Sequence, residues 1–383
     1  MQRIRQGEPP INTLFKYEIN DNDAITIDLS DFQDKRDHLA KIKNSIIYSI
    51  ILFSKNMEHT GNRLKHVNFV SQNNKLMEEK FLPLIFNHSR YFDLTYTPIL
   101  YSDGWKLPDK WLKLIKKIKR MNIEEARNYV FSQNIKGSEE FLFYKAVSDS
   151  SPLQIRYMGY QIGKWNSKEK KIVPVNNKTG KSFIEHAQEL IESRSDPTGK
   201  EYNNKEEHFL ESIILKSILD GERYFNDYKI SPLFTNSVCF QFPVLLKPGD
   251  STSSGNNSSK YVDILAKTAN RPVIMELKVW NKNKNSRGEY MFSALSQVFS
   301  YYNYLDKIFS EGRTQLEGLE ELNWLNPLIF VIINDIGNDE RSENFRNYIR
   351  YIKSYINKNI EFYFIEIDNQ EWQNRRVKEK NII

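Results

Sequence analysis

The stretch that decides the fold of the C-terminal half runs from Tyr261 to Lys278 and reads YVDILAKTANRPVIMELK. Its two apolar runs are rich in Val, Ile and Leu and flank a turn at Asn270-Arg271-Pro272, a pattern that predicts a β-hairpin. Each strand nevertheless carries charge, with Asp263 in the first and Glu276 and Lys278 in the second. A charged side chain among apolar neighbours is costly unless it is paired or bound to a metal. These three residues therefore predict a polar site.

The three charged residues of the hairpin are expected to lie on one face of the sheet. Side chains alternate along a strand, so Glu276 and Lys278, two residues apart, point to the same side. Strand pairing can bring Asp263 beside Glu276. Two carboxylates and an ammonium group in this arrangement make a site for a divalent cation and an activated water.

A helix expected downstream carries a second pattern, because Gln297 and Tyr301 lie four residues, or one helical turn, apart on the same face. The Asp…Glu-x-Lys hairpin followed by a Gln-x-x-x-Tyr helix resembles the PD-(D/E)XK nuclease superfamily, in its RecB-like branch. The resemblance covers residues 204–368, less than half of the chain, and Val262 stands where the superfamily motif has proline. It implies that the Gln297 amide lies near the lysine and the Tyr301 hydroxyl near a phosphate. An ordinary amphipathic helix is the alternative.

The resemblance also implies a metal site. Asp263, Glu276 and the backbone carbonyl of Leu277 are the implied ligands of a Mg²⁺ ion, for which Mn²⁺ can substitute. The metal would lower the pKa of a bound water and offset charge on the phosphate. Lys278 would orient or deprotonate that water and offset the phosphate charge as well. A hairpin with solvated charges is the alternative.

An acidic residue from the first helix commonly completes the site in this superfamily, and the sequence offers two such residues. Glu207 and Glu211 lie one turn apart, on the stripe that runs to Ile214 and Ile218, and the sequence does not separate them. Either one can instead be a solvated charge at the start of the helix, where it favours the macrodipole.

The segments beyond residue 200 predict an α/β domain, a small mixed sheet flanked by helices in the order α-β-β-β-α-β-α-β. Apolar periodicity and turn residues place these elements at 206–222, at 238–246, in the two strands of the hairpin, and at 289–309, 327–333, 341–357 and 360–367. This order matches the restriction-endonuclease-like core that the resemblance implies. We therefore expect a nuclease domain over residues 200–383.

Residues 1–195 predict a separate α+β domain of unknown fold, which would recognise the substrate, regulate the nuclease or assemble the oligomer. A polar stretch with Pro and Gly at 193–200 marks the boundary. The expected elements are a strand at 24–29, helices at 34–55, 108–121 and 182–193, and a hairpin formed by 155–160 and 171–175.

The net charge of +6 is unevenly distributed along the chain. Residues 1–200 carry 32 Lys and Arg against 24 Asp and Glu, a net charge of +8, which leaves −2 for the remaining residues. The N-terminal half is therefore suited to hold a polyphosphate such as DNA.

We expect a cytoplasmic protein that does not enter a membrane. The chain opens without an apolar signal segment, and its longest apolar stretch, residues 45–53, is too short to cross a bilayer. The single cysteine, Cys239, excludes an intramolecular disulfide and a cysteine metal site.

These expectations converge on a Mg²⁺-dependent DNA endonuclease that forms a homo-oligomer and responds to a partner protein or an activating ligand. The layout is similar to that of Shedu-type nucleases, which favours a role in bacterial anti-phage defence. A restriction or DNA-repair endonuclease is the alternative role. A nucleic-acid-binding scaffold that keeps the fold without cleaving is the alternative class, and thermal stabilisation by Mg²⁺ would distinguish the nuclease from it.

Overall fold

The computed structural model describes most of the two ends of the chain and parts of its middle. The described residues are 2–3, 16–20, 23–33, 36–57, 61–77, 81–82, 85, 91–100, 154–157, 160–166, 171–174, 206–219, 224–225, 227–231, 239–245, 260–279, 294–299, 301–302, 305–306, 321–368 and 378–383. None of the helices in this part of the chain combines the length and the apolar character needed to span a bilayer.

The chain divides into two compact units. The first unit comprises Met1–Phe141, Lys284–Phe299 and Asn338–Lys358, and the second comprises Leu142–Asn283, Ser300–Gly337 and Asn359–Ile383. The boundary predicted at 193–200 lies outside the described residues, so the division into domains 1–195 and 200–383 stays a prediction.

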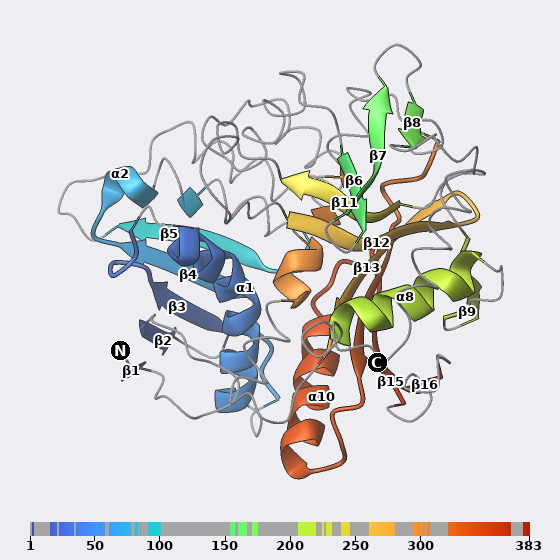
Figure 1. Ribbon diagram of the computed structural model, residues 1–383. Helices are drawn as coiled ribbons and strands as arrows, with labels where there is room; N and C mark the ends of the chain where they lie inside the picture. The colour runs from blue at the N-terminus through green and yellow to red at the C-terminus, as the bar shows by residue number, and fades with distance from the viewer. Residues whose placement is uncertain are drawn as a thin grey trace. The chain divides into compact units, whose positions relative to one another are not determined.

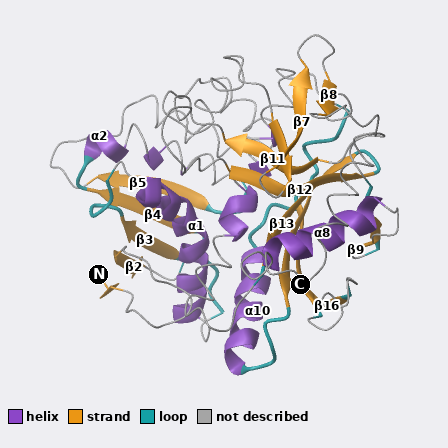
Figure 2. Ribbon diagram, in the orientation of Figure 1, coloured by secondary structure: helices purple, strands orange, loops and turns teal. Residues whose placement is uncertain are grey.

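The first unit contains a five-stranded mixed sheet in the order β1-β2-β3-β4-β5 (Figures 1 and 2). Its strands are β1 (Gln2–Arg3), β2 (Lys16–Asn20), β3 (Ala24–Asp28), β4 (His66–Ser71) and β5 (Thr95–Leu100). Strands β3, β4 and β5 run parallel, whereas β1 and β2 are antiparallel to their neighbours. Ile25 and Ile27 of β3 pair with Val67 and Phe69 of β4, and all four side chains are fully buried.

Helix α1 (Arg36–Met57) connects the parallel strands β3 and β4 and packs against β3. Its apolar residues Ile42, Ile46 and Ile50 recur every four positions and are buried, as expected for one face of an amphipathic helix. Ser45 and Ser49 are also fully buried, and their hydroxyls donate to the carbonyls of Ile42 and Ile46. These local hydrogen bonds satisfy the two hydroxyls inside the core. The short α2 (Asn74–Leu76) follows β4.

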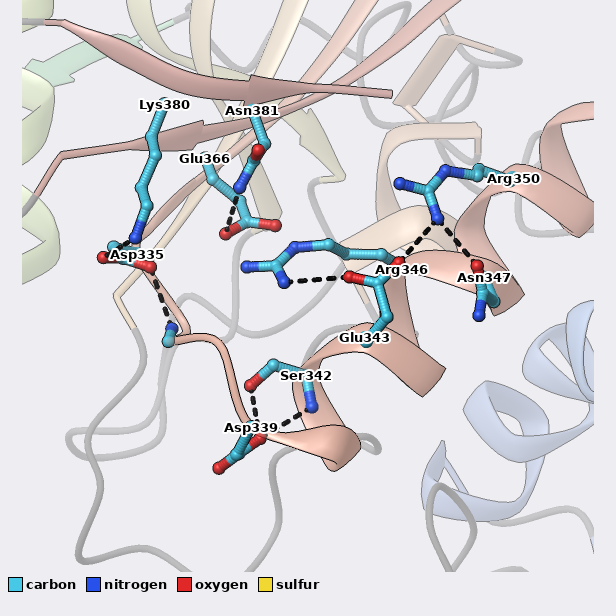
Figure 3. A network of polar contacts seen from close by, with 11 residues as sticks. Asp335, Asp339, Ser342, Glu343, Arg346, Asn347, Arg350, Glu366, Lys380 and Asn381 are labelled. Atoms are coloured by element: carbon cyan, nitrogen blue, oxygen red, sulfur yellow. Dashed lines mark hydrogen bonds and ion pairs between the residues drawn. The ribbon is translucent and has the colours of Figure 1, made fainter.

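Helix α10 (Glu340–Lys353) belongs to the first unit and packs against α1. It begins at Asp339, whose carboxylate accepts a hydrogen bond from the backbone nitrogen of Ser342 at 2.8 Å (Figure 3). The segment after the helix is held by two early residues of the chain. The Tyr355 hydroxyl accepts from the backbone nitrogen of Leu64 at 2.9 Å, and Arg63 donates to the carbonyl of Ser354 at 2.7 Å.

The second unit contains a six-stranded mixed sheet in the order β11-β12-β13-β14-β15-β16. Its strands are β11 (Cys239–Leu245), β12 (Lys260–Thr268), β13 (Arg271–Lys278), β14 (Leu328–Asn334), β15 (Glu361–Ile367) and β16 (Glu379–Ile382). Strands β13, β14 and β15 run parallel, and the other neighbours are antiparallel. Every residue of β14 is buried, which explains its uninterrupted apolar sequence, because a central parallel strand is covered on both faces.

Smaller elements complete the second unit. They are helix α8 (Glu206–Leu219), the pair β9 (Tyr224–Phe225) and β10 (Tyr228–Lys229), and the antiparallel sheet β6 (Gln154–Tyr157), β7 (Tyr160–Asn166) and β8 (Lys171–Pro174). Helix α8 packs against β12 and β13. The Phe225 ring packs on Phe330 of β14, with ring centroids 5.4 Å apart.

The stretch from Tyr261 to Lys278 forms the hairpin β12–β13, as predicted, but its turn lies elsewhere. Thr268 pairs with Arg271, so Ala269 and Asn270 alone form the turn, and the predicted turn at 270–272 is wrong. Ala269 has φ = +50°, the left-handed backbone conformation that two-residue hairpin turns use. The Pro272 that suggested a turn instead pairs with Lys267 within the sheet.

The predicted α/β class is confirmed at the level of two mixed sheets with helices, and several expected elements differ from the structure. The strands or helices expected at 24–29, 34–55, 206–222, 238–246, 327–333, 341–357 and 360–367 are present with bounds shifted by a few residues. The hairpin expected from 155–160 and 171–175 is wrong, because β7 lies between β6 and β8 and pairs with both. The helices expected at 108–121 and 182–193 lie outside the described residues. Of the helix expected at 289–309, the described residues 294–299, 301–302 and 305–306 are helical.

Candidate active site

The hairpin β12–β13 brings its charged residues together at the end of β13. Ile264 pairs with Met275, and the same antiparallel register continued by one residue sets Asp263 opposite Glu276. Side chains that face each other across two strands lie on the same face of the sheet. Helix α8 packs on these strands and carries Glu207 and Glu211. We call these four carboxylates and Lys278 the carboxyl-end cluster.

Lys278 is the cation of the carboxyl-end cluster. Its Nζ lies 2.7 Å from Oε1 of Glu276, 2.8 Å from Oε1 of Glu207 and 3.0 Å from the backbone carbonyl oxygen of Leu277. Lys278 is only 7% exposed and Glu276 only 1% exposed. The short contact with Glu276 agrees with the prediction that residues 276 and 278 share a face of the strand.

Glu276 and Asp263 have few hydrogen-bond donors for their oxygens. Asp263 accepts from the backbone nitrogen of Leu277 at 2.7 Å. The Oε2 atom of Glu276 is buried and receives no hydrogen bond from any described residue. A buried carboxylate oxygen without a donor is costly, so this oxygen calls for a proton or a cation.

The electrostatics of the carboxyl-end cluster disfavour two ionised carboxylates on the hairpin. Burial, followed by the negative charge of Glu276, raises the pKa of Asp263 well above its ordinary value, and Lys278 only partly opposes this. Burial likewise raises the pKa of Glu276, against the lowering effect of the Lys278 charge. A raised pKa on adjacent carboxylates is what desolvation and like charge produce together.

Glu207 and Glu211, which the sequence could not separate, occupy different surroundings. Glu207 forms the ion pair with Lys278, and its side chain keeps 33% of its surface exposed. Glu211 is only 2% exposed, and its negative charge raises the pKa of Asp263 more than the charge of Glu207 does. Both candidates therefore lie in reach of the cluster, one at the lysine and the other toward Asp263.

Gln297 and Tyr301 fall in different units. Tyr301 belongs to the second unit and is buried. Burial and then the negative charges of Glu276 and Asp263 raise the pKa of its hydroxyl, which places Tyr301 within electrostatic range of the hairpin. Gln297 belongs to the first unit, and its buried Oε1 has no hydrogen-bond partner among the described residues. Its predicted place near the lysine stays a prediction.

The carboxyl-end cluster offers a fitting set of ligands for Mg²⁺. The unsatisfied Oε2 of Glu276 and the carboxylate of Asp263 are hard oxygen donors, and Mg²⁺ is usually held by one or two carboxylates together with water. The Leu277 carbonyl, the third predicted ligand, here accepts from Lys278. Within the described residues, no group of three or more His, Cys, Asp or Glu side chains is arranged to hold a metal ion.

A second polar group lies at the opposite end of β13, and the sequence analysis did not single it out. Arg271 forms an ion pair with Oε2 of Glu361 at 2.8 Å. The other oxygen of Glu361 accepts from the hydroxyls of Tyr228 and Tyr363. These four residues form what we call the amino-end cluster. The available signal was a charged residue at the first position of both β13 and β15.

Comparisons of the chain with protein-family models, with curated proteins and with solved structures find no match. The functional argument therefore depends on the residues of the carboxyl-end cluster and on their geometry.

Proposed function

We propose that this protein is a Mg²⁺-dependent DNA endonuclease whose second unit carries a PD-(D/E)XK nuclease core. The observation that supports this proposal most is the carboxyl-end cluster itself. Glu276 and Glu207 both form ion pairs with the ammonium group of Lys278, Glu276, Glu211 and Glu207 raise the pKa of Asp263 through their charges, and Oε2 of Glu276 has no donor among the described residues. Groups with strongly shifted pKa values that cluster in this way are typical of functional sites.

Asp263 and Glu276 would hold the metal ion, which when bound supplies Lewis-acid activation of a water and neutralises charge on the phosphate. Hydrolysis would form a bond from a water oxygen to phosphorus while the bond to the leaving sugar oxygen breaks. One water proton goes to solvent, and the leaving oxygen takes up a proton. Lys278 would contribute positive charge beside the reacting phosphate, because its ammonium group forms ion pairs with Glu276 and Glu207 and, while protonated, has no lone pair with which to act as a base.

The DNA substrate, a homo-oligomeric state and a role in anti-phage defence belong to the same proposal and rest on the sequence. The basic N-terminal half would contribute to DNA binding, with a net charge of +8 over residues 1–200. A restriction or repair enzyme would use the same site, so the role does not affect the test of activity.

Cleavage of supercoiled plasmid with Mg²⁺ or Mn²⁺ tests the proposal. We expect the wild type to nick or linearise the circle and Lys278→Ala to lose at least about 10²-fold in rate, the usual cost of removing one electrostatic stabiliser. Lys229→Ala, which removes an exposed lysine of the same unit, should cleave like the wild type. Full activity of Lys278→Ala would exclude the assignment of the site.

The scaffold alternative makes the opposite prediction about metal binding. A nuclease should gain thermal stability with Mg²⁺ through binding to the native state, and Asp263→Asn should lose that gain. If neither Mg²⁺ nor Mn²⁺ changes the melting temperature and the protein cleaves no DNA, the scaffold alternative is favoured.

A further inference from the structure

The ammonium group of Lys278 is held by oxygens from two sources. Glu276 and Leu277 are its own neighbours on β13, whereas Glu207 reaches it from helix α8. Contacts from the same strand move with the lysine. The contact from α8 ties the ammonium position to a second element of the fold.

Helix α8 presents its two acidic side chains to different partners. Glu207 lies 2.8 Å from Nζ of Lys278 and forms an ion pair with it, while its side chain remains partly exposed. Glu211, one turn further along, is almost completely buried.

We propose that Glu207 is a positioning residue, which fixes the Lys278 ammonium group, and that it does not ligate the metal. This inference rests on the proposed nuclease function and assigns one of its two helix carboxylates. Glu211, buried one turn further along the same helix, is then the remaining helix carboxylate for the metal side.

Mn²⁺ binding to the full-length protein, measured by calorimetry in the absence of DNA, distinguishes a positioning residue from a metal ligand. The measurement does not require activity. We expect Glu207→Gln to retain the affinity of the wild type for Mn²⁺. Asp263→Asn, which removes a metal ligand, should weaken binding about tenfold or more. Glu211→Gln is the matched control on the same helix and should weaken binding more than Glu207→Gln does.

Cleavage kinetics then test the positioning role. We expect Glu207→Gln to lower kcat about 10²-fold with little change in KM, because a misplaced charge fails in the transition state. Glu207→Asp, which keeps the charge on a shorter side chain, should recover part of kcat. In a Lys278→Met background, Glu207→Gln should cost nothing further, because the two residues act as one unit.

The outcomes distinguish this inference from the proposed function. If Glu207→Gln weakens Mn²⁺ binding as much as Asp263→Asn does, Glu207 is a ligand and the inference is wrong while the nuclease proposal stands. If Glu207→Gln costs as much activity with Lys278→Met as without it, Glu207 does not act through the lysine. A wild type that neither binds Mn²⁺ nor cuts DNA would overturn the proposed function itself.

Discussion

The two ends of β13 carry charged clusters built in opposite ways. In the amino-end cluster, one carboxylate, Glu361, meets one guanidinium, Arg271, and two tyrosine hydroxyls, so both of its oxygens have donors. Although burial opposes ionisation, the hydrogen bonds from Tyr228 and Tyr363, together with the hydrogen bond and charge of Arg271, lower the pKa of Glu361. This cluster is balanced in charge and hydrogen bonding.

The carboxyl-end cluster is unbalanced by comparison. Its carboxylates outnumber its ammonium group, and the pKa values of Asp263 and Glu276 are raised. A fold gains stability from the first arrangement and loses stability in the second unless a proton or cation is bound. The amino-end cluster is therefore the structural end of β13, and the carboxyl-end cluster is the candidate for chemistry. Functional sites retain groups that lower the stability of the fold.

The largest expected effect, a loss of cleavage, comes from removing a negative charge from the carboxyl-end cluster. Asp263→Asn keeps an oxygen that can accept from the Leu277 backbone nitrogen but removes one negative charge. We expect cleavage to fall by about 10²–10³-fold, while the free energy of unfolding of the metal-free protein stays the same or rises. Plasmid cleavage and urea unfolding with a chelator measure the two quantities. If the variant loses stability along with activity, Asp263 is structural and the distinction between the two clusters is wrong.

A charge removed from the amino-end cluster should instead lower the stability of the protein and leave cleavage unchanged. Glu361→Gln removes the charge that Arg271 and the two tyrosines surround, and hydrogen bonds to a charged group contribute about 1.5–3 kcal/mol. We expect a loss of about 2 kcal/mol in the free energy of unfolding, discounted toward the lower end because Arg271 and Glu361 are partly exposed. Cleavage per folded molecule should not change. Reduced kcat in the folded variant would show that this end also serves catalysis.

Acid should shift the two ends in opposite directions. The raised pKa of Asp263 means that the metal-free native state binds a proton more readily than the unfolded chain, so this destabilisation is complete above the raised value and fades as the pH falls from there toward the ordinary aspartate pKa. The lowered pKa of Glu361 means that its stabilisation is complete above the ordinary glutamate pKa and is lost as the pH falls through the lowered value.

Differences in melting temperature against pH, measured with a chelator, check these signs. The advantage of Asp263→Asn over the wild type should shrink as the pH falls from the raised pKa of Asp263 toward the ordinary aspartate value of about 3.9. The deficit of Glu361→Gln should persist until the pH falls below about 4.3 and shrink only there. A deficit of Glu361→Gln that shrinks already between pH 7 and 5 would contradict the assignment of a lowered pKa.

The smallest expected effect comes from the first unit and serves as a reference for both ends. Tyr355→Phe removes the hydroxyl that accepts from the buried backbone nitrogen of Leu64 at 2.9 Å. An unsatisfied donor costs about 1–3 kcal/mol, and we expect about 1 kcal/mol because Arg63 still binds the neighbouring carbonyl of Ser354. Urea unfolding measures the loss. Cleavage that falls further than the folded fraction would indicate that the first unit also influences the site.

Sequence reasoning predicted those elements whose pattern is local. An apolar run predicts the buried strand β14, and apolar residues at helical spacing predict the amphipathic helix α1. It missed β2 and the interior strand β4 of the first unit. It also missed β5, which carries Pro98, and β16, whose polar sequence gives no alternation. Both are edge strands, which need few apolar residues because one side faces no partner strand.

The candidate site divides in the same manner. The spacing of Glu276 and Lys278 along one strand determined that they share a face, and the hairpin determined that Asp263 lies beside them. Nothing in the sequence could indicate that α8 aims Glu207 rather than Glu211 at the lysine, because one helical turn separates the two and only packing sets the rotation of the helix.

By itself, then, the sequence determined the strands, the helices and the faces on which charges lie, since these depend on repeats of two and 3.6 residues. The tertiary structure alone decided which distant groups meet. It placed α10 in the first unit, paired Glu361 with Arg271, and gave the Lys278 ammonium group its contact from α8. Such contacts join residues dozens to hundreds of positions apart, and they follow from register and packing, which no local pattern records.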